Sequence, residues 1–127
     1  MNLSDAQITT TLIAGDMEAT KTFYTEKVGL KMSTEKREDP GLLLEAGKGT
    51  KIYIYQSELP IPQNTVTSFI VDDVLTTVKE LKAKGVEFET YDMEYIKTDE
   101  NNIAKMGEMQ VAWFKDPSGN ILAIGNM

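Results

Sequence analysis

The chain of 127 residues contains no cysteine and no histidine. Without cysteine it has no disulfide, no thiolate nucleophile and no cysteine-bound zinc or iron–sulfur site. Without histidine it lacks the commonest general base near neutral pH and the commonest metal ligand. These two absences leave Asp, Glu, Lys, Tyr, Ser and Thr as the only side chains for chemistry.

The sequence also lacks long apolar runs and an excess of positive charge. No stretch is long enough to span a bilayer, and the polar start, Met1 to Ala6, does not resemble a signal peptide, so we expect a cytoplasmic protein without membrane contacts. The formal net charge of −7 argues against a nucleic-acid partner, because an acidic surface repels phosphates. It favours a cationic ligand, although the same charge could serve solubility alone.

Strand and helix signals occur twice in the same order. The first set predicts a strand over 8–14, a helix over 17–27 after the N-cap Asp16, and strands over 30–36, 42–46 and 51–56. The second set predicts a strand over 65–71, a helix over 74–84 after Asp72 and Asp73, and strands over 86–91, 111–115 and 121–124. Gly29 and Gly85 end the two helices.

This order predicts one mixed α+β domain, residues 1–127, built from two βαβββ modules, 6–57 and 64–127. Each helix would cover the outer face of a sheet, and the inner faces would form a cup-shaped curved sheet around a ligand. Residues 92–110 are polar and weakly periodic, which predicts either a strand broken by a solvated loop or a lid over the cup.

Two short motifs resemble a known family. Phe23-Tyr24 with Gly29-Leu30, and the hairpin Phe114-Lys115-Asp116-Pro117-Ser118-Gly119-Asn120, are similar to signatures of the vicinal oxygen chelate superfamily of glyoxalases, bleomycin-resistance proteins and dioxygenases. The resemblance covers nearly the whole chain. It implies a glyoxalase/bleomycin-resistance-like fold and a homodimer that binds a small molecule, but the fold hosts many functions.

The resemblance also locates a metal site. Metal-dependent members place His, Glu or Gln at four inward positions, which in this chain hold Thr9, Tyr53, Val66 and Ala123. A divalent ion needs several charged or strongly donating ligands to offset its dehydration. We therefore expect no metal and no cofactor at this site, and none of the metal-dependent chemistry of the relatives.

Alternation along the strands, combined with the family geometry, predicts the lining of the cup. The predicted ligand-binding residues are Thr9, Thr11, Leu43, Tyr53, Tyr55, Val66, Ser68, Trp113 and Ala123. Apolar walls with a few hydroxyls are typical of a binding pocket. The aromatic residues could instead fill the cup as core, and the hydroxyl residues could be ordinary strand residues.

The sequence is compatible with three functions. The first is a metal-free small-molecule-binding protein that sequesters an aromatic or cationic compound such as an antibiotic. The second is a glyoxalase- or dioxygenase-like lyase or isomerase that works without metal, with Glu45, Tyr53 or Tyr55 as acid or base. The third is a metalloenzyme with unrelated ligands in the long loop: Asp92, Glu94, Asp99 and Glu100.

Overall fold

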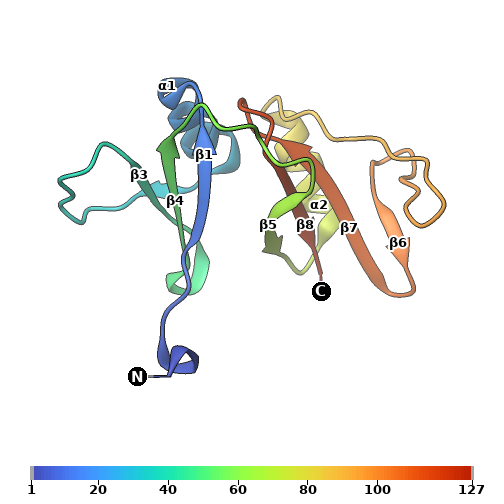
Figure 1. Ribbon diagram of the computed structural model, residues 1–127. Helices are drawn as coiled ribbons and strands as arrows, with labels where there is room; N and C mark the ends of the chain where they lie inside the picture. Colours follow the sequence, from blue (N-terminus) through green and yellow to red (C-terminus); the bar gives the residue numbers. More distant parts are fainter. Residues whose placement is uncertain (1, 127) are drawn as a thin grey trace. The chain divides into compact units, whose positions relative to one another are not determined.

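The computed structural model describes residues 2–126 and divides into two compact units between Leu59 and Pro60. Each unit contains one four-stranded sheet and one principal helical segment (Figure 1). Within residues 2–126, no helix combines the length and the apolar content needed to cross a membrane.

The first unit has the strand order β1-β4-β3-β2. Its elements are η1 (Leu3–Asp5), β1 (Thr10–Ala14), α1 (Met17–Thr22), η2 (Phe23–Val28), β2 (Lys31–Met32), β3 (Leu42–Glu45), η3 (Gly47–Gly49) and β4 (Lys51–Gln56). β1 pairs in parallel with β4, and the other pairs are antiparallel. The second unit repeats this arrangement, which confirms the predicted pair of βαβββ modules.

The first helix starts where the sequence predicts and continues in an unexpected form. Asp16 caps it, because its Oδ1 accepts a 3.0 Å hydrogen bond from the backbone N–H of Ala19. After the six residues of α1 the helix widens into the π-helix η2, where Phe23 and Tyr24 are both buried. Gly29 ends it in the left-handed region, at φ 90°, as predicted.

The predicted strand over 30–36 is wrong beyond its first residues, since β2 covers only Lys31–Met32. Ser33 ends it by forming a turn in which its hydroxyl accepts a 3.2 Å hydrogen bond from the N–H of Glu35. The released segment, residues 33–41, becomes a loop beside the sheet and contributes to the site described below. Likewise β1 begins at Thr10 rather than at residue 8.

The second unit has the strand order β5-β8-β7-β6. Its elements are β5 (Thr65–Ile70), α2 (Val74–Ala83), β6 (Ala104–Met106), β7 (Met109–Lys115) and β8 (Ile121–Gly125). Asp73 is the N-cap of α2, accepting a 3.0 Å hydrogen bond from the N–H of Thr76. The predicted turn at 116–120 is confirmed, because the buried Asp116 accepts hydrogen bonds from the backbone of Ser118 and Asn120.

The predicted strand over 86–91 is wrong, and the second strand of this unit along the chain is β6, inside the 92–110 segment for which the sequence predicts a strand broken by a solvated loop or a lid. Residues 86–103 make only isolated bridges, among them Phe88 to Phe114. The physical reason is that side chains form hydrogen bonds with some of the backbone N–H and C=O groups that would otherwise pair with a neighbouring strand. Asn102 Nδ2 donates to the carbonyl oxygen of Glu89, and Thr98 Oγ1 accepts from the N–H of Tyr91.

The buried residues of each unit lie mainly between the sheet and its helix. In the first unit Leu12, Leu44 and Ile54 of the sheet are buried together with Tyr24 of η2. In the second unit the buried side of α2 consists of Val74, Val78 and Leu81, while β8 is buried along its whole length. Because residues on both faces of β8 are buried, the second sheet has little open surface near this strand, and the opposite face of the first sheet is the more open surface for a site.

Candidate functional site

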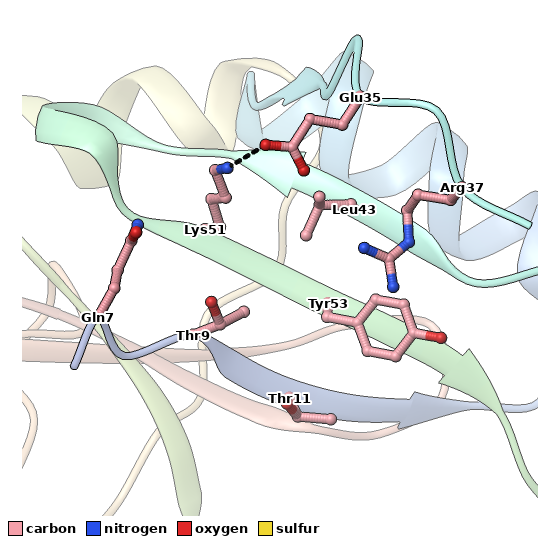
Figure 2. A pocket seen from close by; sticks show the side chains of 8 residues that line it. All are labelled: Gln7, Thr9, Thr11, Glu35, Arg37, Leu43, Lys51 and Tyr53. Carbon is pink, nitrogen blue, oxygen red and sulfur yellow. Dashed lines mark hydrogen bonds and ion pairs between the residues drawn. The ribbon is translucent and has the colours of Figure 1, made fainter. Parts of the chain in front are cut away.

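An open hollow of about 350 Å³ lies on the sheet face of the first unit (Figure 2). It is lined by residues of β1, β3, β4 and the flanking loops: Gln7, Thr9, Thr11, Glu35, Arg37, Leu43, Lys51 and Tyr53. Thr11 and Leu43 stand on either side of Tyr53 in the strand register. The structure thus brings together four of the predicted binding residues, namely Thr9, Thr11, Leu43 and Tyr53.

Tyr53 is held on two sides by residues of the 33–41 loop. Its hydroxyl donates a 3.0 Å hydrogen bond to Asp39 Oδ1, and the Arg37 guanidinium carbon lies 4.6 Å from the centre of its ring. A guanidinium at this distance is attracted to the aromatic face. The ring also stacks on Tyr55, with centroids 6.1 Å apart, so the predicted residue Tyr55 adjoins the hollow without lining it.

Arg37 and Asp39 form a forked ion pair. Arg37 Nη2 lies 2.8 Å from Asp39 Oδ2, and Arg37 Nε donates a longer hydrogen bond, 3.4 Å, to Oδ1. The hydrogen bond from Arg37, followed by that from the N–H of Gly41, lowers the pKa of Asp39, and Asp39 raises the pKa of Arg37. Both groups are therefore charged at neutral pH.

Gly41 makes room for the Tyr53 ring. A β-carbon at position 41 would lie only 2.5 Å from Cε1 and 2.6 Å from Cζ of Tyr53, closer than real β-carbons approach other atoms. The glycine is therefore required by the close approach of the ring. It also anchors the loop end, since its N–H donates to Asp39 Oδ1 at 3.0 Å.

A second ion pair borders the hollow. Lys51 Nζ lies 2.9 Å from Glu35 Oε1, and this hydrogen bond lowers the pKa of Glu35. Lys51 is the more enclosed partner, with 22% of its side chain exposed against 57% for Glu35. Together with Arg37 it places two cationic side chains in the lining of a chain whose net charge is −7.

Sequence reasoning missed Gln7, Glu35, Arg37, Lys51 and the supporting Asp39. For Lys51 a signal was present, because it has the same strand parity as Tyr53 and therefore shares its face. For Arg37 and Asp39 no local pattern showed that the loop folds back toward the sheet. Their position depends on contacts with Tyr53 that are distant in sequence.

The remaining predicted binding residues lie in the second unit. Ser68 and Trp113 are both register partners of Ala123, so these three share one sheet face. Val66 lies where the register of β5 shifts, between Thr65 and Thr67, and has no partner residue in β8. The alternation used in the sequence prediction is therefore interrupted at Val66.

Trp113 is buried, with 7% of its surface exposed. It belongs to an apolar cluster against which Tyr91 and Ile96 of the long segment pack, and the Tyr91 ring meets the Trp113 ring edge-on with centroids 5.3 Å apart. Burial raises the pKa of Tyr91. Residues of the same unit therefore cover the indole that the sequence suggested as a ligand platform.

The residues at the four metal-ligand positions do not fit a divalent metal. Val66 and Ala123 have hydrocarbon side chains, and the Tyr53 hydroxyl is engaged with Asp39 beside the fixed positive charge of Arg37. Across residues 2–126 no three Asp or Glu side chains gather closely enough to hold an ion.

The other acids raised by the sequence are placed away from such chemistry. Glu45 is an exposed residue at the end of β3 and does not line the hollow. Asp99 Oδ1 accepts hydrogen bonds from the N–H groups of Asn101 and Ile103, so it serves to shape its own turn. Neither carboxylate is positioned as the acid or base of a catalytic pair.

The fold and these motifs define the class of the protein. A family model described as the Glyoxalase/Bleomycin resistance protein/Dioxygenase superfamily matches residues 7–124, and the chain belongs to this superfamily. The predicted fold, two βαβββ modules of the glyoxalase/bleomycin-resistance type, is confirmed.

Three similar proteins illustrate the range of the family. The uncharacterized protein YurT of Bacillus subtilis is 27% identical over 132 aligned residues, covering 92% of this chain and 95% of that protein. A superfamily member from Sphaerobacter thermophilus matches with a TM-score of 0.73 at 22% identity, covering 97% of this chain and 98% of the other. TnmS3, an antibiotic binding protein from Streptomyces sp. CB03234, matches with a TM-score of 0.63 at 19% identity, covering 94% and 95%. The two structural likenesses show the fold alone.

Proposed function

We propose that this chain is a small-molecule-binding protein that holds its ligand without a catalytic metal. The observation that carries the proposal is the Arg37–Asp39–Tyr53 arrangement at a family metal-ligand position. A guanidinium fixed beside Tyr53 supplies positive charge where relatives would hold an ion, and it would repel a second cation. Two of the other three ligand positions have no donor atom at all.

The hollow has the features of a binding surface. Tyr53 and Leu43 provide apolar contact, while Thr9, Thr11 and the ion pairs provide polar groups that can orient a ligand. TnmS3 is described as an antibiotic binding protein, which supports a sequestering role for this chain. We propose an aromatic ligand. Because the net charge favours a cationic one, the test below includes cationic aromatic compounds. Val66, Ser68, Trp113 and Ala123 stay predicted contacts of the second unit.

Thermal unfolding tests the binding. A panel of planar aromatic compounds, with cationic, neutral and anionic members, is added to the purified protein. A ligand present at 100 times its dissociation constant stabilises the folded state by about 2.7 kcal/mol, which corresponds to a rise in Tm of roughly 10 °C. Tyr53→Ala should abolish the rise, whereas the matched control Tyr95→Ala, at an 84% exposed position of the second unit, should keep it. A panel without any stabilising compound would contradict the proposal.

Metal content tests the other half of the proposal. We expect elemental analysis of the purified protein to find no stoichiometric metal, and calorimetric titration with Zn²⁺, Mn²⁺ or Ni²⁺ to show no tight binding. One bound ion per chain, lost on mutation of Thr9 or Tyr53, would overturn the metal-free assignment. The proposal further includes a homodimer located in the cytoplasm. Light scattering of the purified protein would test the dimer.

A further inference from the structure

Two cationic side chains of the first-unit hollow, Arg37 and Lys51, carry hydrogen-bond donors that their partner acids do not use. A guanidinium has five N–H groups, and Asp39 takes up two of them through Nε and Nη2. An ammonium has three, of which Lys51 uses one on Glu35. Figure 2 shows the Lys51 ammonium turned toward Glu35 and the Arg37 guanidinium beside the Tyr53 ring of β4, and both side chains line the hollow. The donors left on Arg37 and Lys51 therefore border the space that a ligand would enter.

The carboxylates of the same region are engaged. The pKa values of Asp39 and Glu35 are both lowered by their cationic neighbours, so the two acids are ionised at neutral pH and bound to those neighbours. Asp39 is also the acceptor for Tyr53. A cationic ligand would compete with Arg37 and Lys51 for these acids, whereas an anionic ligand could bind the remaining N–H donors of Arg37 and Lys51 without breaking either pair.

An apolar surface lies next to these donors. The Tyr53 ring, which also contacts Arg37 and Tyr55, and the side chain of Leu43 supply the apolar part of the lining. An anionic oxygen attached to an aromatic ring would place its charge between Arg37 and Lys51 and its ring against this surface. Aromatic side chains contact the ring of such a ligand, and a guanidinium can bind its anionic oxygens through two hydrogen bonds.

We propose that the ligand class of this hollow is a planar aromatic anion, such as an aromatic carboxylate or an ionised phenol, received by Arg37 and Lys51. The inference rests on the proposed binding function and names the ligand chemistry for it. It departs from the cationic ligand that the net charge of −7 suggests, because the local charges differ from the average over the chain. Arg37 and Lys51 are the residues that determine the specificity for charge.

Three probes of similar size and different charge test the inference: salicylate, salicylamide and benzamidine. Their affinities are measured by calorimetry, and the resonance of Arg37 Nε–H is followed by NMR during each titration. We expect salicylate to bind at least tenfold more tightly than the other two, to shift the Arg37 resonance and to bind more weakly as NaCl is added. Equal or tighter binding of benzamidine or salicylamide would overturn the inference, and so would failure of salicylate to bind.

Charge-removing variants locate the contact. Arg37→Gln and Lys51→Gln should each weaken salicylate binding roughly tenfold or more, since each removes a charged hydrogen-bond donor. Lys36→Gln removes an exposed charge from the same loop and should leave the affinity unchanged. If Arg37→Gln unfolds the loop, Lys51→Gln decides the question alone, and unchanged affinity in it refutes the inference. A cationic or neutral binder from the wider panel would refute the anion but leave the binding function intact, whereas no binder at all would remove both.

Discussion

Substituting Gly41 by alanine should move the Tyr53 ring while leaving the fold in place. The new β-carbon would lie 2.5 Å from Cε1, and ordinary contact begins near 3.4 Å, so the ring must retreat by about 1 Å. That displacement can lengthen the 3.0 Å hydrogen bond from the Tyr53 hydroxyl to Asp39 by up to about 1 Å, which is enough to take it beyond hydrogen-bond range. The ring is the far end of a side chain that can rotate, so the backbone need not shift.

The expected cost in stability is small because two effects oppose each other. A side chain forced off its preferred rotamer costs about 0.5–1.5 kcal/mol, and replacing Gly by Ala stabilises by about 0.4–1 kcal/mol through the unfolded chain. The free energy of unfolding should therefore change by less than about 1 kcal/mol, and Tm by less than roughly 5 °C.

NMR of the Tyr53 ring and hydroxyl resonances, together with urea unfolding, measures both parts of this prediction. Gly47→Ala is the matched control, because a β-carbon there meets nothing within 4 Å. We expect large shifts at Tyr53 in Gly41→Ala and none in the control, with tenfold or greater loss of salicylate affinity only in the former. Unchanged Tyr53 resonances in Gly41→Ala, or a loss of stability of several kcal/mol, would refute the reasoning.

Three further outcomes are expected. Asp116→Ala removes a buried carboxylate that accepts three hydrogen bonds within its turn, and urea unfolding should show a loss of about 2–4 kcal/mol. Tyr91→Ala uncovers Trp113, so the tryptophan emission should shift to longer wavelength; unchanged emission would contradict the packing. The lowered pKa values of Glu35 and Asp39 stabilise the folded state at pH values above their ordinary 4.5 and 3.8, and this contribution is lost as the pH falls through the lowered values. Carboxyl NMR should therefore place the titration midpoint of each group below its ordinary pKa.

Much of the fold could be predicted because its signals are local. Asp16 and Gly29 bound the first helix through contacts with neighbouring residues, and the turn from Asp116 to Asn120 is closed by its own side chains. The repeat of strand, helix and three strands follows from such signals. The alternation within β3 and β4 likewise predicted that Leu43 and Tyr53 share a face.

Two of the failures have their physical origin in contacts between residues far apart in the chain, whereas β2 is ended by the local contact between Ser33 and Glu35. Residues 86–91 have the composition of a strand, but Asn102 takes their carbonyl groups instead of a neighbouring strand. The local sequence around Arg37 and Asp39 indicates only a turn. The position of this loop is set by Tyr53, many residues later, whose ring and hydroxyl contact the two side chains. Neither partner is visible in a short window of sequence.

The two sheets share one strand order, yet their equivalent faces contain different things. In the first unit the face around Tyr53 is charged and open to solvent, whereas in the second the face around Trp113 is filled by Tyr91 and Ile96 of the same unit. Two units with the same strand order can thus have different roles. The first has a solvent-accessible hollow that a ligand can enter and leave, while the second contributes buried packing that stabilises the fold. Random mutagenesis should reflect this difference. Substitutions near Trp113 should lower the yield of folded protein, whereas substitutions near Tyr53 should alter ligand binding and leave the yield unchanged.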